Sequence, residues 1–153
     1  MTAEVADFTG LPGPYDLIWS AGAAYDPGLG RALAAFRGAL GPAGCIAFSH
    51  LCWRTGPRPD AAVAFWAAEF PAMTDRAGAE AEVAAAGLRI LDAFWLPPAA
   101  WAAYYLPMEA RLDALTAGAD AEMAAVIAAH RAEIAIWRAH GDSYGYRLMV
   151  VAP

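Results

Sequence analysis

Hydrophobic residues recur along the chain in two patterns, short unbroken runs and longer stretches with a helical period. The unbroken runs are rich in β-branched and aromatic residues and are bounded by Gly, Pro or polar turns, which is typical of buried strands. They occupy residues 15–21, 45–49, 88–95 and 146–152. The chain is therefore expected to contain four strands.

Helical periods fill the segments between these runs. After the first run, Asp26-Pro27 is a typical helix start, and Gly41-Pro42 is expected to end that helix. Four apolar residues recur on one face between them: Leu29, Leu33, Phe36 and Leu40. Further helical stretches are expected over residues 60–70, 75–86, 99–115 and from Gly118 to Trp137.

The order of strand, helix and strand predicts an α/β fold. A right-handed crossover would place the first two strands side by side and parallel. Residues 50–59 contain Gly, Pro and Arg and are expected to form a loop. Pro97-Pro98 end the third strand, so residues 98–140 are expected to form an inserted helical pair within a single domain, 1–153.

Composition narrows the classes of partner. Of the 153 residues, 59% are hydrophobic and 17% are charged, which excludes a disordered chain. All ten cations are Arg, and they are scattered among 16 acids, so the net charge is -6. Without a basic patch, neither nucleic acid nor an anionic membrane is an expected partner.

Cysteine usage and hydropathy favour a soluble, cytoplasmic protein without a metal site. Cys45 and Cys52 lack the paired spacing of zinc ligands and are expected to be reduced thiols. No apolar stretch approaches the roughly 20 residues of a membrane span. The amino-terminal residues also lack the basic start and apolar core of a secretory signal.

The order of several short motifs resembles the second half of a class I S-adenosylmethionine-dependent methyltransferase domain. The segment with Asp7-Phe8 and Leu11-Pro12 precedes the run YDLIWS at residues 15–20, and LGPAG at residues 40–44 introduces the next strand. In that family these segments follow strand three, form strand four and introduce strand five. The resemblance covers nearly the whole chain and implies a Rossmann-like half-domain with a mixed four-stranded sheet. Two parallel strands, an antiparallel closing pair, helices on both faces and the sheet order first, second, fourth, third are expected.

The sequence departs from the family in one respect. The Gly-rich loop after strand one and the acid after strand two, which hold the cofactor, have no counterpart in this chain. The resemblance therefore implies a truncated methyltransferase, a transferase that is inactive or weak as an isolated chain. A truncated reading frame, an evolutionary remnant and a half supplied by another chain all remain open.

Two groups of residues match cofactor-binding positions of the family, with S-adenosylmethionine as the implied cofactor. Asp7 matches the acid that accepts a hydrogen bond from the adenine amino group, and Phe8 matches the residue whose backbone meets the ring. Trp19, Ser20, Ala21 and Gly22 match the end of strand four, between cofactor and acceptor. Alternatively, Asp7 and Phe8 belong to a loose terminus, and Trp19 is a core residue.

Candidate catalytic residues are expected just beyond the strands. Tyr25 and His50 follow the first and second strands, and His50 could serve as a general base because its ordinary pKa lies near neutrality. As a lone loop histidine, it could equally be a surface group. Aromatic residues around the loop and helical pair could cover a small apolar or cationic acceptor, or simply fill a core: Trp53, Trp66, Trp101, Tyr104 and Tyr105.

Two functions are compatible with these residues. The first is methyl transfer from S-adenosylmethionine to a small-molecule acceptor. The second is a non-catalytic interaction module that forms a homodimer through the exposed strand at residues 15–21 or the adjacent helix faces, because its usual neighbour, strand one, is missing. A fragment of another Rossmann-like nucleotide-binding protein, such as a dehydrogenase, is the weakest alternative, because the expected antiparallel last strand does not fit it.

Overall fold

The computed structural model describes residues 3, 5–54 and 56–153, which form one α/β unit. Along the chain its elements are η1 (Phe8–Gly10), β1 (Tyr15–Ala21), α1 (Leu29–Gly38), β2 (Leu40–Trp53), α2 (Asp60–Glu69), α3 (Arg76–Ala85), β3 (Arg89–Trp95), α4 (Pro98–Thr116), α5 (Ala121–His140) and β4 (Tyr144–Ala152). The predicted alternation of strands and helices is confirmed.

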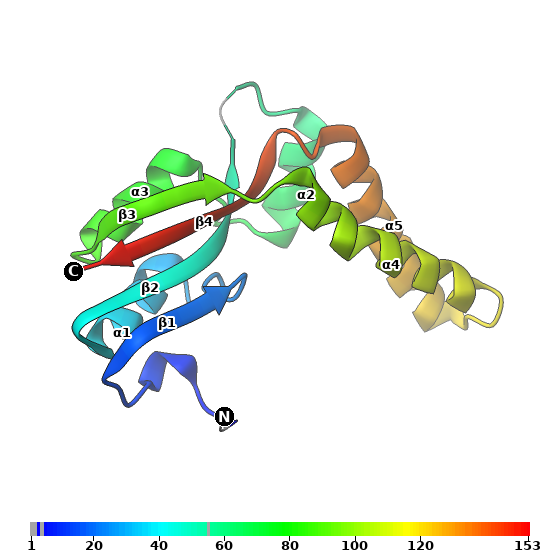
Figure 1. The fold of residues 1–153 in the computed structure, drawn as a ribbon. Coiled ribbons are helices and arrows are strands. Elements are labelled where there is room, and N and C mark those ends of the chain that lie inside the picture. Colours follow the sequence, from blue (N-terminus) through cyan, green and yellow to red (C-terminus); the bar gives the residue numbers. More distant parts are fainter. Residues whose placement is uncertain (1–2, 4, 55) are drawn as a thin grey trace.

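The four strands form one mixed sheet in the order β1-β2-β4-β3. β1 runs parallel to β2, whereas β4 runs antiparallel to both β2 and β3. This is the expected order of first, second, fourth and third strand (Figure 1). The carboxyl ends of the parallel pair therefore meet at one edge, where residues from both strands can contribute to a site.

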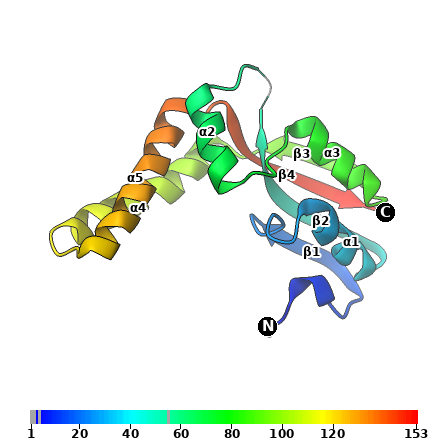
Figure 2. The same cartoon turned by 180° about the vertical axis from the view of Figure 1, so that it is seen from behind.

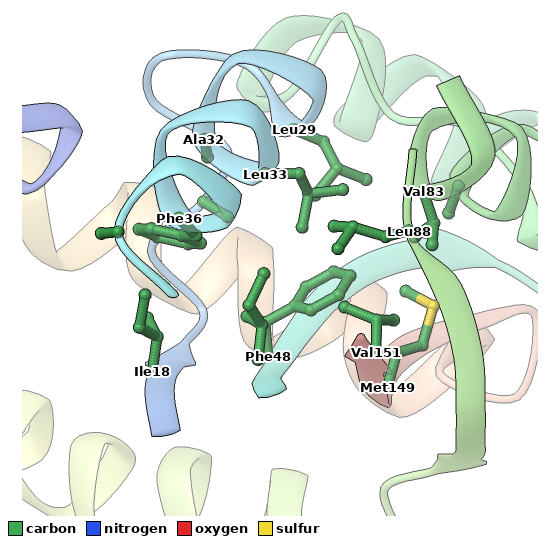
Figure 3. Close-up of a cluster of buried hydrophobic side chains, with 14 of the residues drawn as sticks. Ile18, Leu29, Ala32, Leu33, Phe36, Phe48, Val83, Leu88, Met149 and Val151 are labelled. Atoms are coloured by element: carbon green, nitrogen blue, oxygen red, sulfur yellow. The ribbon is translucent and has the colours of Figure 1, made fainter. Parts of the chain in front are cut away.

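One face of the sheet is covered by α1 and α3, which lie side by side against the strands (Figure 2). Leu33 and Phe36 of α1 and Val83 of α3 belong to one buried cluster with Phe48 of β2 and Met149 of β4, and all five are almost inaccessible to solvent (Figure 3). Apolar burial of this kind is the main stabilising contribution to a domain of this size.

The opposite face is covered only at one end. Leu51 and Trp53 of β2, with Tyr144 of β4, pack there against aromatic and aliphatic residues of α2, α4 and α5. The expected helical pair is α4 and α5, which project away from the sheet as an arm (Figure 1). Among the described helices, none is both long and apolar enough to cross a membrane.

The boundaries of two elements, α1 and β2, differ from the prediction. α1 begins at Leu29 rather than at Asp26-Pro27, because Gly28 takes a positive φ of 88° and acts as the N-cap. α1 also ends at Gly38 rather than at Gly41-Pro42. β2 runs from Leu40 to Trp53 instead of residues 45–49, so Leu40, which was expected on the apolar face of the helix, belongs to this strand. β2 lies between β1 and β4, and pairing with both neighbours extends the strand beyond its most apolar stretch. The prediction that residues 50–53 form a loop is therefore wrong.

Candidate functional site

A cavity of about 510 Å³ lies at the carboxyl ends of β1 and β2. Ala21 and Gly22 at the end of β1, and Ser49 and Leu51 of β2, form the part nearest the sheet. The opposite walls come from α2, α4, α5 and β4. In open α/β sheets, ligands bind beyond the carboxyl ends of the parallel strands, so this cavity is the candidate site.

Gly22 shapes the entrance to the cavity from β1. Its φ of 60° lies in the left-handed region, and a Cβ atom there would lie 3.5 Å from the ring of Tyr146. Its N–H donates a hydrogen bond of 3.0 Å to Ser49 Oγ. A glycine therefore lets the chain turn sharply at the end of β1 while it stays close to β2.

Aromatic rings from four parts of the chain line the cavity: the loop after β1, α2 with its C-cap, α4 and β4. The rings are those of Tyr25, Trp66, Phe70, Trp101, Tyr104 and Tyr146. Behind them lie Tyr105 and Tyr144, which are fully buried, and the ring of Tyr105 stacks on that of Trp101 at 5.5 Å. Stacked and edge-to-face rings of this kind attract one another beyond the effect of their burial alone.

The charge of the cavity is negative. Glu69 and Glu133 are its only charged lining residues within the described part of the chain. Glu133 Oε1 accepts a hydrogen bond of 2.7 Å from Tyr105 Oη, and its Oε2 lies 3.6 Å from His130 Nδ1. Burial raises the pKa of Tyr146, and also that of Tyr104, so both phenols are neutral at physiological pH.

Three of the predicted site residues, Ala21, Gly22 and Tyr25, line the cavity. Of the aromatic residues expected either to cover an acceptor or to fill a core, Trp66, Trp101 and Tyr104 line it, whereas Trp53 and Tyr105 do not. Ser20 is buried and shares the face of β1 with Ile18, on the side of the sheet that α1 covers. Trp19 lies on the other face but is 63% exposed, so its alternative assignment as a core residue is wrong. The structure therefore brings together only part of the expected set.

Asp7 and Phe8 lie away from the cavity. Asp7 caps η1, and its carboxylate accepts hydrogen bonds from the backbone N–H and the hydroxyl of Thr9. These hydrogen bonds lower the pKa of Asp7. Phe8 packs against Phe36 of α1, with 5.7 Å between ring centroids. Neither residue is positioned to reach a molecule in the cavity.

His50 occupies a different place from the one predicted. It lies within β2, is 4% exposed, and forms an edge-to-face pair with the ring of Phe70, with 5.8 Å between centroids. Burial lowers its pKa to about 4, so the imidazole is neutral at physiological pH. His50 does not line the cavity. Phe70 lies between them, because it lines the cavity and also packs against His50.

Four lining residues were not expected from the sequence, namely the carboxylates of Glu69 and Glu133 and the rings of Phe70 and Tyr146. One signal was present for Glu69, which lies in the last turn of α2, where a negative charge opposes the helix dipole. Glu133 adjoins the apolar stripe of α5, next to Ile134. No group of three or more potential metal ligands occurs among the described residues.

No family model matches the sequence, and no curated protein matches it. Solved structures do match. A methyltransferase from Geobacter sulfurreducens, dependent on S-adenosylmethionine and in complex with S-adenosyl-L-homocysteine, is 19% identical with a TM-score of 0.73. The match covers 97% of this chain and 62% of that one. A corresponding complex from Thiobacillus denitrificans is 20% identical with a TM-score of 0.73, and covers 96% and 62% of the two chains.

The cyclopropane synthase MmaA2 from Mycobacterium tuberculosis is similar to the same extent. It is 16% identical with a TM-score of 0.72, and the match covers 97% of this chain and 59% of that one. This chain therefore spans less than two thirds of the length of each of these three proteins. The sheet order, the helices and these likenesses together show that the chain has the Rossmann-like fold of the class I S-adenosylmethionine-dependent methyltransferases.

Proposed function

We propose that this chain forms the acceptor side of a methyltransferase that acts on a small molecule. The observation that carries the proposal is the aromatic cavity at the carboxyl ends of β1 and β2, at the same edge as the Gly22 turn. Two of the matching proteins are described as S-adenosylmethionine-dependent methyltransferases, so the same compound is the proposed methyl donor for this chain.

The residues of this chain fit an acceptor better than a donor. Bound S-adenosylmethionine supplies an electrophilic methyl group. The cavity would orient the acceptor and exclude water from it, since methyl transfer depends mainly on positioning. Of the residues that the resemblance placed beside the donor, only Ala21 and Gly22 line the cavity. We therefore expect the isolated chain to bind the donor weakly. Most donor contacts would come from the part of the matching structures that this chain does not cover.

Equilibrium dialysis with labelled S-adenosylmethionine tests this proposal. The purified chain should show weak, saturable binding that S-adenosylhomocysteine displaces. Gly22→Ala should weaken it, because the left-handed turn beside Ser49 is strained by a side chain. Gly28→Ala is the matched control, since Gly28 also has a positive φ but lies away from the cavity. No binding at millimolar donor would contradict the proposal for this chain.

A second candidate, a homodimeric interaction module, rests on the exposed surface of β1. This strand lies at the edge of the sheet and pairs only with β2 among the described strands. Leu17 and Trp19 are 56% and 63% exposed on the face that α1 does not cover. An exposed apolar edge strand favours pairing with another chain, so we propose that a second copy covers it.

Light scattering at tens of micromolar distinguishes a dimer from a monomer. A dimer would have twice the chain mass of 16.1 kDa. Trp19→Arg should shift the mass toward that of a monomer, because it places a charge on the proposed contact. Val126→Arg provides the control, since Val126 is also exposed but lies on α5. A monomeric wild-type chain would exclude this second candidate.

A further inference from the structure

We propose that the cavity at the ends of β1 and β2 binds a small organic cation, a protonated or quaternary amine. This inference rests on the proposed function only in assigning that amine to the methyl acceptor. The binding itself follows from three features of the cavity, which are its aromatic walls, its two carboxylates and the absence of a basic lining residue among those described.

The aromatic walls provide several faces for a cation. Tyr25 follows β1, Trp66 belongs to α2, Trp101 and Tyr104 to α4, and Tyr146 to β4, so the rings approach the cavity from different directions. The centroids of Trp101 and Tyr146 lie 5.3 Å apart, at an interplanar angle of 38°. A cation within about 6 Å of such rings is attracted to their negative faces, most strongly where water is excluded.

The two carboxylates supply the opposite charge. Glu133 is held in place by the hydrogen bond from Tyr105, and its side chain is only 24% exposed. Glu69 lies at the carboxyl end of α2, where its charge is unfavourable by itself and a bound cation would compensate it. His130 is the titratable neighbour of Glu133, 3.6 Å away, but its side chain is 42% exposed and does not line the cavity.

Several arginines that could neutralise the cavity are engaged elsewhere. The guanidinium of Arg54 stacks over Trp95 and that of Arg58 over Trp53. Ion pairs hold others, namely Arg131 with Asp113, Arg138 with Glu109 and Arg147 with Glu80. The cavity therefore keeps a negative potential together with apolar walls, and this combination selects an amine over a neutral or anionic ligand of the same size.

Choline and 3,3-dimethyl-1-butanol are suitable probes, because they share a shape and differ in the charge of one central atom. Binding to the purified chain would be measured by calorimetry or by ligand-observed NMR, without methyl donor. Choline should bind at least tenfold more tightly than the neutral alcohol, and the difference should shrink in high salt. Equal or tighter binding of the alcohol, or no binding of either probe, would overturn the inference.

Variants locate the binding. Glu133→Gln should weaken choline binding about three- to tenfold and leave binding of the alcohol unchanged. Tyr104→Leu should weaken it as well, and because Tyr104 is half-exposed this change does not open the core. Glu122→Gln is the control, since Glu122 also lies on α5 but outside the cavity. An equal loss in Glu122→Gln would show a general charge effect and contradict the site.

The outcomes for the cation and for methyl transfer can be told apart. Choline binding without any binding of S-adenosylmethionine would support the cation site and contradict the proposed methyltransferase role. Binding of S-adenosylmethionine together with a preference for the neutral alcohol would support the methyltransferase role and contradict the cation site.

Discussion

The two hydrophobic clusters of this protein lie on opposite faces of one sheet and differ in chemistry. The cluster under α1 and α3 is mainly aliphatic, with residues such as Leu33, Ile46 and Val151. Its side chains carry almost no groups that can form hydrogen bonds. The cluster at the base of the arm is built from Trp and Tyr side chains and adjoins Glu133. It also contains two buried polar atoms without a hydrogen-bond partner among the described groups, Trp66 Nε1 and Tyr144 Oη.

The two clusters therefore have different roles: the aliphatic one contributes to stability, and the aromatic one can also recognise a ligand. An aliphatic cluster gains stability from close packing alone. Aromatic rings with polar atoms can pack almost as well, yet they retain groups that recognise a ligand. The cavity borders only the aromatic cluster, through residues such as Trp66 and Trp101. We therefore expect substitutions in the first cluster to affect folding, and those in the second to affect binding as well.

The largest expected effect is the loss of packing in the aliphatic cluster. Phe48→Ala should lower the free energy of unfolding by about 3–5 kcal/mol, because Phe48 is buried between the sheet and α1. Urea denaturation measures this change. Phe94→Ala is the matched control, since Phe94 is half-exposed on β3 and should cost less than about 1 kcal/mol. Similar losses at both positions would contradict the assignment of this core.

A smaller loss of stability is expected when the pH is lowered. The pKa of His50 falls from 6.5 to about 4 on folding, so the unfolded chain takes up the proton first. The stability that this residue contributes is complete above about pH 6.5 and is lost as the pH falls toward 4. Between pH 7 and 4.5 the loss from His50 should be about 2–3 kcal/mol.

Denaturation of His50→Gln over the same range checks this expectation. The variant should lose less stability than the wild type as the pH falls, whatever its stability at pH 7. If His50→Gln keeps the wild-type slope instead, the imidazole is not held neutral by burial.

The smallest of these effects concerns one hydrogen bond in the aromatic cluster. Tyr105→Phe removes the donor to Glu133 without a change in packing, and should lower the free energy of unfolding by about 1–2 kcal/mol. It should also weaken choline binding, because Glu133 loses the contact that orients it. Tyr104→Phe is the comparison variant, since Tyr104 is half-exposed. If Tyr104→Phe lowers the free energy of unfolding as much as Tyr105→Phe does, this role of the hydrogen bond is contradicted.

Much of the fold could be predicted from hydrophobic pattern and motif order. Tyr15–Ala21 is a strand over the expected residues, and the strands that end at Trp95 and Ala152 are within two residues of the expectation. The candidate site was harder to predict. Of the two expected catalytic residues, Tyr25 lines the cavity and His50 does not, because the loop that should carry His50 is part of β2.

The positions of strands and helices followed from the amino-acid order alone, because periodicity and turn residues act over a few positions. The likeness to methyltransferases followed from it too, through the order of its short motifs. Which side chains share the cavity depended instead on the folded chain. Glu69 and Glu133 are 64 positions apart along the chain (133 − 69), and the packing of α5 against α2 brings both to one cavity. Such a meeting depends on how whole elements pack, which no local pattern encodes.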